Sequence, residues 1–176
     1  MNTAAVSEFR RPVRLDELEN GEVHRTVEAG DEERTALARR FDVVAIDALA
    51  ASVRVRRVSG GPLVRVEGRL TADVVQRCVV TLEPLPVHIE EDFAETFGPD
   101  GYRAPGGGED TDVPEVFDDS GIDLGELAAQ LLSLSLDPYP RAPGTGVLRQ
   151  PGAGEDAGER RTPFAVLGEL MQKQRK

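Results

Sequence analysis

The feature that most constrains this chain is a strict alternation of apolar and polar residues between Val64 and Val74. Successive side chains of a β-strand point to opposite faces, so this period of two predicts a strand with one dry face and one wet face. The dry positions are Val64, Val66, Gly68, Leu70, Ala72 and Val74. The wet positions are Arg65, Glu67, Arg69, Thr71 and Asp73. After a break, we expect the dry pattern to continue at Cys78, Val80 and Leu82.

Two further alternating segments flank this run. Before it, Val53 and Val55 alternate with arginines, and residues 59–62 (Ser-Gly-Gly-Pro) supply a turn. After two prolines the parity flips, and the apolar positions become Val87, Ile89, Phe93 and Phe97. The simplest structure with this pattern is an antiparallel sheet covered on one side. We therefore predict an α+β fold: an antiparallel, partly curved sheet or open barrel with two or three packing helices and long Gly/Pro-rich loops.

A first helix is predicted over residues 32–41. Asp31 would cap it, and arginines in its last turn suit the negative end of the helix dipole. Its sheet-facing residues would be Ala36, Leu37 and Phe41.

A second helix, over residues 123–136, has the clearest signal. Asp123 is a good N-cap, and Glu126 three residues later completes a capping-box pattern. One apolar stripe recurs at helical spacing, formed by Leu124, Leu127, Ala128, Leu131 and Leu134. Two prolines, Pro138 and Pro140, are expected to end this helix.

The rest of the chain is divided by weaker signals. Short strands are predicted at residues 9–14, 23–29 and 113–118, a turn or single helical turn at 15–18, and a short strand followed by a connection at 42–50. The predicted domain covers residues 1–141, with a core sheet (52–97), an acidic loop (98–119) and a helix (123–136). Residues 142–162 read as a flexible linker and residues 163–176 as a short C-terminal helix or tail.

Composition excludes several classes of protein. A single cysteine can form neither an internal disulfide nor a cysteine-based zinc site, which favours a reducing, cytoplasmic location. No secretory leader is recognised, and no apolar stretch is long enough to span a bilayer. His24 and His88 lie in separate alternating strands without an evident partner, and Cys78 falls on a dry position. We therefore expect solvated histidines, a buried inert thiol, no catalytic residues, no metal and no cofactor.

The net charge of −11 is unevenly distributed. Residues 90–126 hold 13 acidic residues and one basic residue, a local charge of −12, so the rest sums to +1. Binding of nucleic acid needs clustered cations, and a basic protein partner suits the acidic segment better.

One basic cluster stands against this trend. Four arginines lie on the wet positions of two strands joined by a tight turn: Arg54, Arg56, Arg65 and Arg69. Arg77 follows close by. If the strands pair, the guanidinium groups share one face that could meet RNA phosphates or an acidic partner. The alternative is an ordinary polar face neutralised by Glu67 and Asp73.

Three stretches together resemble the YceD family of bacterial and plastid proteins, known for accumulation of large-subunit ribosomal RNA. They are residues 75–84 (VQRCVVTLEP), residues 120–141 (SGIDLGEL running on to LDPYPR) and residues 162–167 (TPFAVL). The residues that carry the family motifs are Cys78, Asp123, Leu124, Pro140, Pro163 and Phe164. Many members have a Cys-x-x-Cys pair where this chain has Val75 and Cys78, so a metal site suggested by those members is not expected here.

The resemblance implies a non-enzymatic factor needed for accumulation or maturation of large-subunit ribosomal RNA, acting in assembly of that subunit. Its partners would be that RNA or its precursor, a basic ribosomal protein, or both, and no membrane. Two alternatives remain open at this point: a chaperone for one basic ribosomal protein without RNA contact, and an RNA-processing enzyme.

Overall fold

A computed structural model describes residues 7–58, 61–102, 114–117 and 121–145 of this protein. The chain divides into two units, Met1–Ala142 and Pro143–Lys176, and the fold below is that of the first. The predicted linker and C-terminal helix lie outside the described residues, apart from residues 142–145, and so do Pro163 and Phe164.

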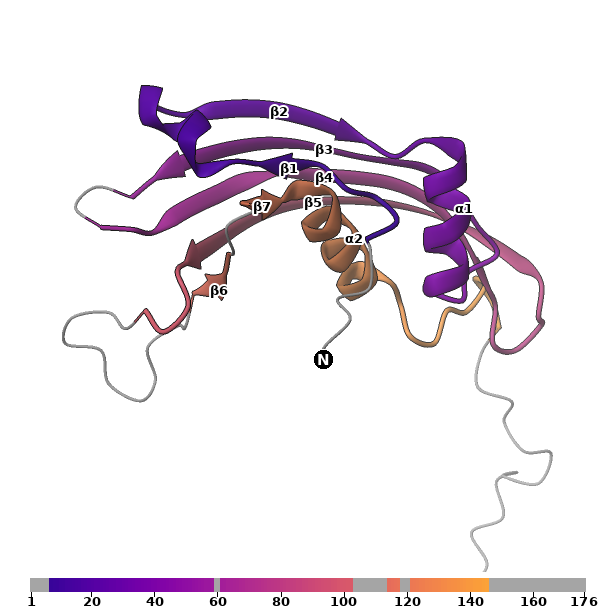
Figure 1. The fold of residues 1–176 in the computed structure, drawn as a ribbon. Coiled ribbons are helices and arrows are strands. Elements are labelled where there is room, and N and C mark those ends of the chain that lie inside the picture. The colour runs from indigo at the N-terminus through magenta and orange to yellow at the C-terminus, as the bar shows by residue number, and fades with distance from the viewer. Residues whose placement is uncertain (1–6, 59–60, 103–113, 118–120, 146–176) are drawn as a thin grey trace, which may run out of the picture. The chain divides into compact units, whose positions relative to one another are not determined.

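A five-stranded sheet in the order β2-β3-β4-β5-β6 forms the centre of this unit (Figure 1). Four antiparallel strands make up most of it: β2 (Val23–Glu28), β3 (Ala45–Arg57), β4 (Val64–Arg77) and β5 (Pro84–Gly98). The short β6 (Glu115–Val116) pairs parallel with the end of β5. The sheet curves over α2 (Figure 1). Within the described ranges its edge strands β2 and β6 do not pair with each other, so the sheet does not close into a barrel. The predicted α+β class is confirmed, with an open sheet.

The dry face predicted for β4 is confirmed. Val64, Val66, Leu70, Ala72 and Val74 are each at most 1 % exposed. Burial of one such valine or leucine side chain stabilises the fold by about 1.5–3 kcal/mol, so this strand supplies much of the core. The neighbouring strands add the same face, including Val53, Val55, Ile89 and Phe97.

Gly68 interrupts the row of branched side chains on this face for a steric reason. It lies opposite Val53 of β3 and Phe93 of β5. A Cβ atom at this position would collide with the backbone oxygen of Ser52 and would lie 2.9 Å from Cζ of Phe93. The ring of Phe93 therefore occupies the space that a side chain would need.

Two α-helices and a 3₁₀-helix occur in the described part of the chain. The 3₁₀-helix η1 (Leu15–Asn20) follows β1 (Pro12–Val13), and α1 (Asp31–Arg40) packs on β3. The predicted α1 is confirmed, but Gly30 rather than Asp31 is the N-cap. Leu37 and Ala38 are its buried residues, whereas Ala36 is only half-buried.

The second helix, α2 (Leu124–Ser135), lies under the sheet, and its predicted N-cap is confirmed (Figure 1). The predicted stripe is partly wrong, because Leu134 is 83 % exposed while Ala129 and Leu132 are fully buried. Glu126 also differs from its predicted capping role, since its carboxylate pairs with Arg40 of α1 at 2.7 Å.

The predicted connection within residues 42–50 is wrong, because β3 runs without a break from Ala45 to Arg57. The register shifts between Ile46 and Ala48, which marks a β-bulge. An extra residue in one strand moves all later side chains to the opposite parity. The buried positions accordingly change from Ile46 to Leu49 and Ala51, which hid the strand from a search for period two.

The predicted continuation of the dry pattern beyond Arg77 is wrong for Val80 and Leu82. Strand β4 ends at Arg77, and residues 78–83 form a turn. Two backbone hydrogen bonds close this turn: the N–H of Leu82 donates to the oxygen of Cys78, and the N–H of Cys78 donates to the oxygen of Glu83. Cys78 is buried, but Val80 and Leu82 are 44 % and 64 % exposed.

Candidate functional site

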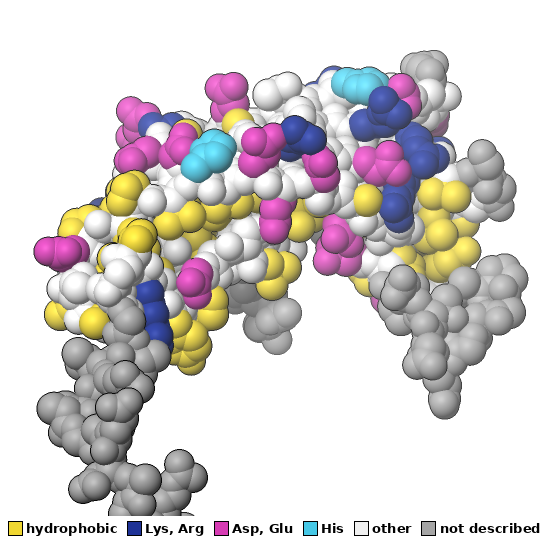
Figure 2. All heavy atoms as spheres, turned by 180° about the vertical axis from the view of Figure 1, so that it is seen from behind, with side chains coloured by type: hydrophobic (Ala, Val, Ile, Leu, Met, Phe, Trp, Pro, Cys, Tyr) yellow, Lys and Arg dark blue, Asp and Glu magenta, His cyan; other side chains and the backbone are white. Residues whose placement is uncertain are grey.

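The four predicted arginines do share the outer face of the sheet. Arg54 of β3 lies opposite Glu67 of β4, and Arg56 lies opposite Arg65. Arg69 lies two positions beyond Glu67 on β4. Figure 2 shows basic and acidic side chains interspersed over one side of the unit, with both imidazole rings among them. The face therefore carries both signs of charge.

Each of these guanidinium groups has an acidic partner. Arg69 contacts Glu90 at 2.6 Å and Asp92 at 2.7 Å, and this contact lowers the pKa of Asp92. Arg56 and Arg65 both contact Glu67, at 3.4 and 3.2 Å. Arg54 lies 3.8 Å from Glu22, a carboxylate whose pKa is lowered mainly by its hydrogen bond to His24.

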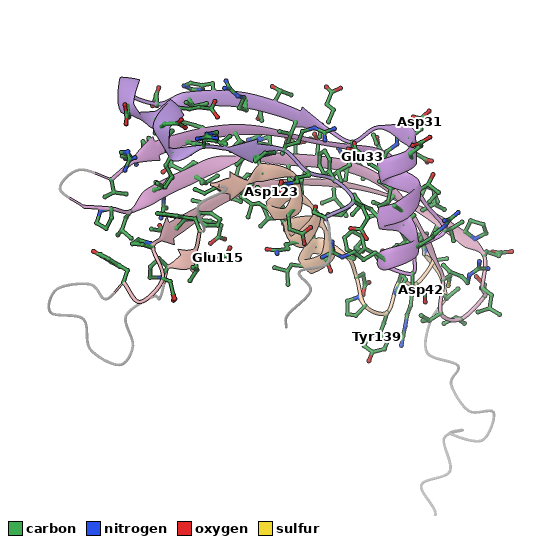
Figure 3. All side chains as sticks on the ribbon, in the orientation of Figure 1. Asp31, Glu33, Asp42, Glu115, Asp123 and Tyr139 are labelled. Atoms are coloured by element: carbon green, nitrogen blue, oxygen red, sulfur yellow. The ribbon has the colours of Figure 1, made fainter. Side chains whose placement is uncertain are left out.

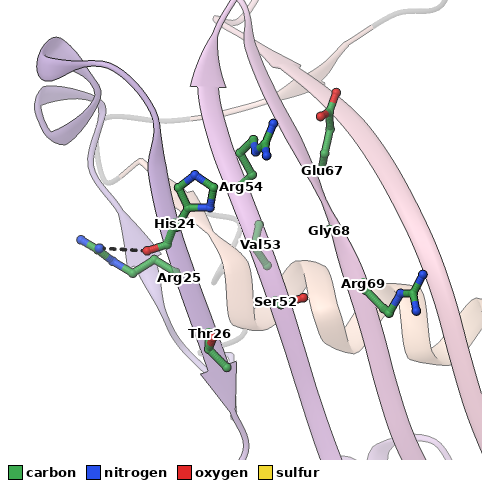
Figure 4. Close-up of a pocket in the computed structure, with 9 residues that line it drawn as sticks. All are labelled: His24, Arg25, Thr26, Ser52, Val53, Arg54, Glu67, Gly68 and Arg69. Carbon is green, nitrogen blue, oxygen red and sulfur yellow. Dashed lines mark hydrogen bonds between the residues drawn. The ribbon is translucent and has the colours of Figure 1, made fainter.

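An open depression of about 560 Å³ lies between β2, β3 and β4 on this face (Figure 4). Its polar wall includes His24, Arg54, Glu67 and Arg69. None of the residues that line it is a Phe, Tyr or Trp, whose rings stack on unpaired bases in single-stranded RNA sites. The arrangement is that of an ion-paired polar surface, and the prediction that it contacts RNA stays a prediction.

Arg77 is separate from this group. It lies at the end of β4, where its guanidinium donates to the backbone oxygen of Leu82 at 3.3 Å. It has no acidic partner within the described part of the chain. The residues around Arg77 form part of a second site.

That site forms where two of the family-like stretches meet. The amide Nε2 of Gln76 donates to the oxygen of Asp137 at 2.9 Å. The N–H of Val79 donates to the oxygen of Pro140 at 2.9 Å. Residues 76–83 and 136–142, which are far apart in the sequence, are thus joined by direct hydrogen bonds. We call this pair of segments the motif junction.

Cys78 lies at the centre of the motif junction. Its side chain is fully buried, as predicted, and Sγ accepts hydrogen bonds from the N–H groups of Thr81 at 3.5 Å and Ala142 at 3.3 Å. Hydrogen bonding from the Thr81 side chain, and then from these backbone groups, lowers the pKa of Cys78 to about 6. Hydrogen bonds to a thiolate favour the charged form, so the thiol is a structural acceptor that ties residue 142 to the turn.

A depression of about 670 Å³ opens beside the motif junction. Val44, Val79, Leu82 and Pro138 contribute to its wall, together with the side chain of Gln76. Gln76 is 5 % exposed, and its Oε1 atom accepts no hydrogen bond from the described residues. A buried acceptor without a partner costs about 1–3 kcal/mol, so this atom calls for an explanation.

The sequence contains a signal for Gln76, which is not among the predicted site residues. Residue 76 falls on the dry parity of β4, where every other position from Val64 to Val74 except Gly68 is a buried apolar residue. A polar residue on a dry position must find a buried partner or serve a site. The side-chain nitrogen of Gln76 has such a partner in the oxygen of Asp137, while its side-chain oxygen has no partner among the described residues.

The other motif stretch, residues 120–127, has a structural role. Oδ1 of Asp123 accepts hydrogen bonds from the N–H groups of Arg11 at 2.8 Å, Gly125 at 3.0 Å and Glu126 at 3.3 Å. It therefore caps α2 and also holds the N-terminal segment, beside the small sheet of β1 and β7 (Ile122–Asp123) (Figure 3).

Two glycines of the same stretch allow this close approach. Gly121 has a φ of +96°, and a Cβ atom there would collide with the backbone oxygen of Val13. A Cβ atom at Gly125 would collide with the backbone oxygen of Phe9. Leu124 between them is 1 % exposed, so this motif is explained by packing against the N-terminal segment.

A family model described as "Large ribosomal RNA subunit accumulation protein YceD" matches residues 66–171 of the chain. The chain belongs to the YceD family. The match covers more than half of the chain, and it includes both segments of the motif junction and the Asp123 cap. No curated protein and no solved structure shows significant similarity to the chain.

Two further findings concern what the described residues hold. None of their helices is both long and apolar enough to cross a membrane. They also contain no group of three or more His, Cys, Asp or Glu side chains placed to hold a metal ion.

Proposed function

We propose that this protein is a non-enzymatic factor that supports accumulation or maturation of large-subunit ribosomal RNA by acting in assembly of the large subunit. The family match carries this proposal, because the family is described by accumulation of that RNA. The step in assembly and the mode of action are our extension of that description.

The histidines support a binding role over RNA cleavage. Among the described residues, the imidazole ring of His24 is hydrogen-bonded to Glu22, at 2.9 Å, and that of His88 to Asp73, at 2.7 Å. Both pairs are exposed on the outer face and lie on different strands. A carboxylate can orient an imidazole ring, but acid–base cleavage also needs a second group within reach of the reacting atoms. A cleavage assay with the purified protein and precursor RNA tests this directly.

Free carboxylates support contact with a basic protein. Glu90 and Asp92 are already paired with Arg69, and Asp123 and Glu126 are used inside the fold. Four other acidic residues of the segment have no ion pair among the described residues. Glu91 accepts a hydrogen bond from the Ser135 hydroxyl, and the remaining three are Glu95, Asp100 and Glu115. Glu95 and Glu115 lie near the place where β5 meets β6, and Figure 3 labels Glu115 there. We infer that a basic ribosomal protein is contacted at this end of the sheet.

Direct contact of the outer arginine face with RNA receives less support. Phosphates would have to replace carboxylates that already lie within 2.6–3.8 Å of the four guanidinium groups. Contact with a protein, with or without RNA nearby, is therefore the favoured mode.

The experiment is measurement of mature and precursor large-subunit RNA in a strain that lacks the protein. We expect mature large-subunit RNA to fall, or its precursor to accumulate, relative to small-subunit RNA. Unchanged levels of both would overturn the proposed function.

A second experiment tests the mode of contact by co-sedimentation with precursor particles. Neutralising Glu95, Asp100 and Glu115 as the triple amide variant should weaken association at least about threefold, since each exposed ion pair contributes little alone. The matched control neutralises three exposed acidic residues that also have no ion pair among the described residues, Glu19, Glu32 and Asp47. Equal effects of the two triples would remove the assigned contact. Loss of association on charge reversal of the four outer arginines would instead support RNA contact.

A further inference from the structure

We propose that the open edge of β5 is a docking site for an extended segment of a basic protein, which adds to the sheet as a further strand. This inference rests on the proposed contact with a basic protein and deepens it, because it states how the partner is held and which residues the bound segment carries.

The edge of β5 is covered only at its end. On one side β5 pairs with β4 from Pro84 to Phe97, and no register shift interrupts this pairing. On the other side β6 pairs only with Phe97 and Gly98 (Figure 1). No strand in the described part of the chain pairs with that side of β5 before Phe97. An open strand edge offers its backbone groups to an added strand.

The pairing with β6 shows which backbone groups face the open side. The oxygen of Gly98 accepts a hydrogen bond from the N–H of Phe117, the residue after β6, at 3.1 Å. The backbone groups of Gly98 therefore point away from β4. Backbone groups of a strand point alternately to its two sides, so those of the even-numbered residues between 88 and 96 also point to the open side.

Two prolines agree with this assignment and bound the site. Pro84 and Pro86 at the start of β5 have the same even parity. Proline lacks an N–H and is tolerated in a sheet where the N–H would face outward from an edge. The two prolines also leave no donor for an added strand. The open part of the edge is therefore residues 88–96, which span about 30 Å. We call these residues the edge window.

Charge on the edge window determines which occupant it favours. It holds no Lys or Arg and four carboxylates, those of Glu90, Glu91, Asp92 and Glu95. Arg69 of β4 pairs with two of them on the outer face. The other two, Glu91 and Glu95, have no ion pair among the described residues. A row of carboxylates attracts a basic strand and repels RNA, and it also repels the same edge of a second copy.

The side of the edge window that faces α2 sets a more specific pattern. Phe93 lies between Glu91 and Glu95 on this side and packs partly buried against the core. The hydroxyl of Ser135, in the last turn of α2, donates to Glu91, and the neighbouring Leu134 is 83 % exposed. Apolar surface is thus bracketed by two carboxylates.

This order of groups predicts the bound sequence. An added strand directs every second side chain to the side that faces α2. Opposite Glu91, Phe93 and Glu95 we expect a basic, an apolar and a basic residue, separated by one residue each. The predicted order is the same whether the segment runs parallel or antiparallel to β5.

The test uses a labelled nine-residue peptide, Thr-Thr-Lys-Thr-Val-Thr-Lys-Thr-Thr, and the full-length protein, with binding measured by fluorescence anisotropy. We expect it to bind at least about tenfold more tightly than Thr-Thr-Thr-Lys-Val-Lys-Thr-Thr-Thr, which has the same composition but places Lys and Val on opposite sides of a strand. A peptide with Glu in place of both Lys residues should not bind. Equal affinity of the two basic peptides would overturn the proposal, because charge alone would then explain binding.

Variants of the protein locate the bound peptide. Glu91→Gln/Glu95→Gln should weaken binding about fivefold, since each exposed ion pair contributes little alone. The matched control, Glu32→Gln/Asp47→Asn, also removes two exposed carboxylates that have no ion pair among the described residues and should leave the affinity unchanged. Equal effects of the two double variants would refute the assignment to β5.

Methylation of the peptide tests strand addition itself. Only every second N–H of an added strand faces β5. Methyl groups on alternate backbone nitrogens should therefore abolish binding for one parity and preserve it for the other. The same loss for both parities would refute pairing of the peptide backbone with β5.

Amide hydrogen exchange followed by NMR tests whether the edge is free. The amides of Glu90, Asp92 and Ala94 should exchange rapidly in the protein alone and become protected when the peptide binds. Protection without the peptide would show that the edge is already covered, by a second copy or by the chain itself, and would overturn the proposal. Displacement of the peptide by a twelve-nucleotide single-stranded RNA would assign the surface to nucleic acid and would also overturn it.

The outcome is separable from that of the proposed function. If large-subunit RNA falls in the strain without the protein but the alternating peptide does not bind, strand addition is refuted and the proposed function stands. If the peptide binds as predicted but the RNA levels are unchanged, the proposed function is refuted and the docking site stands.

Discussion

Substitution of Asp123 by alanine should strongly destabilise the fold, because this carboxylate has two separate tasks. As the N-cap of α2 it accepts from the N–H groups of Gly125 and Glu126, and loss of such a cap costs about 1 kcal/mol. It also accepts from the N–H of Arg11, which would be left without that acceptor, at a cost of about 1–3 kcal/mol. The expected loss in the free energy of unfolding is therefore about 2–4 kcal/mol.

The assay is equilibrium unfolding in urea, followed by circular dichroism. Asp123→Asn keeps an oxygen acceptor at the same place and gives up only the 3.9 Å contact with Arg10, so it should lose less than about 1 kcal/mol. Asp16→Ala, at an exposed carboxylate of η1, is the control for loss of an acidic residue. If Asp123→Ala and Asp16→Ala had equal effects, the reasoning from the cap and the N-terminal contact would be refuted.

Three further predictions concern the core, the thiol and the turn. Gly68→Ala should lower the free energy of unfolding by about 1–3 kcal/mol in urea melts, because its Cβ has no room, whereas Gly61→Ala should be nearly neutral; equal effects would contradict this packing. Because the pKa of Cys78 is lowered from 9.0 to about 6, the unfolded state binds more protons in this interval, and stability should rise with pH from about 6 to about 9. Cys78→Ala should abolish this rise, and thiolate absorbance at 240 nm should titrate near pH 6; titration near 9 would disprove the shift. Leu82 has a φ of +63°, so Leu82→Gly should stabilise the protein by about 1 kcal/mol in thermal melts; a loss of stability would show that the side chain is needed for folding.

The sheet could be predicted where one rule acted alone. From Val64 to Val74 the chain is a regular strand with a core on one side, so period two translated directly into burial. The prediction failed where a local irregularity changed the rule. The bulge at Asp47 shifted the parity of β3. The turn after Arg77 ended β4, although apolar residues continue at alternate positions as far as Leu82 in the sequence.

The candidate sites show a similar division. The shared face of the four arginines followed from strand alternation, but their ion pairs depend on register, which sets Arg69 opposite Asp92. The motif junction could not be predicted, because the contact between Gln76 and Asp137 joins segments separated by β5 and α2. The fixed parity of Gln76 was the one local clue to it.

The ratio of large to small ribosomal particles in sucrose gradients tests the central claim most directly. We would measure it in a strain that lacks the protein and is supplied with the wild type, with the triple amide variant at Glu95, Asp100 and Glu115, or with Arg→Gln at Arg54, Arg56, Arg65 and Arg69. We predict a deficit of large particles without the protein, recovery with the wild type and the arginine variant, and only partial recovery with the acidic variant. A normal ratio without the protein, or full recovery with the acidic variant, would contradict the account.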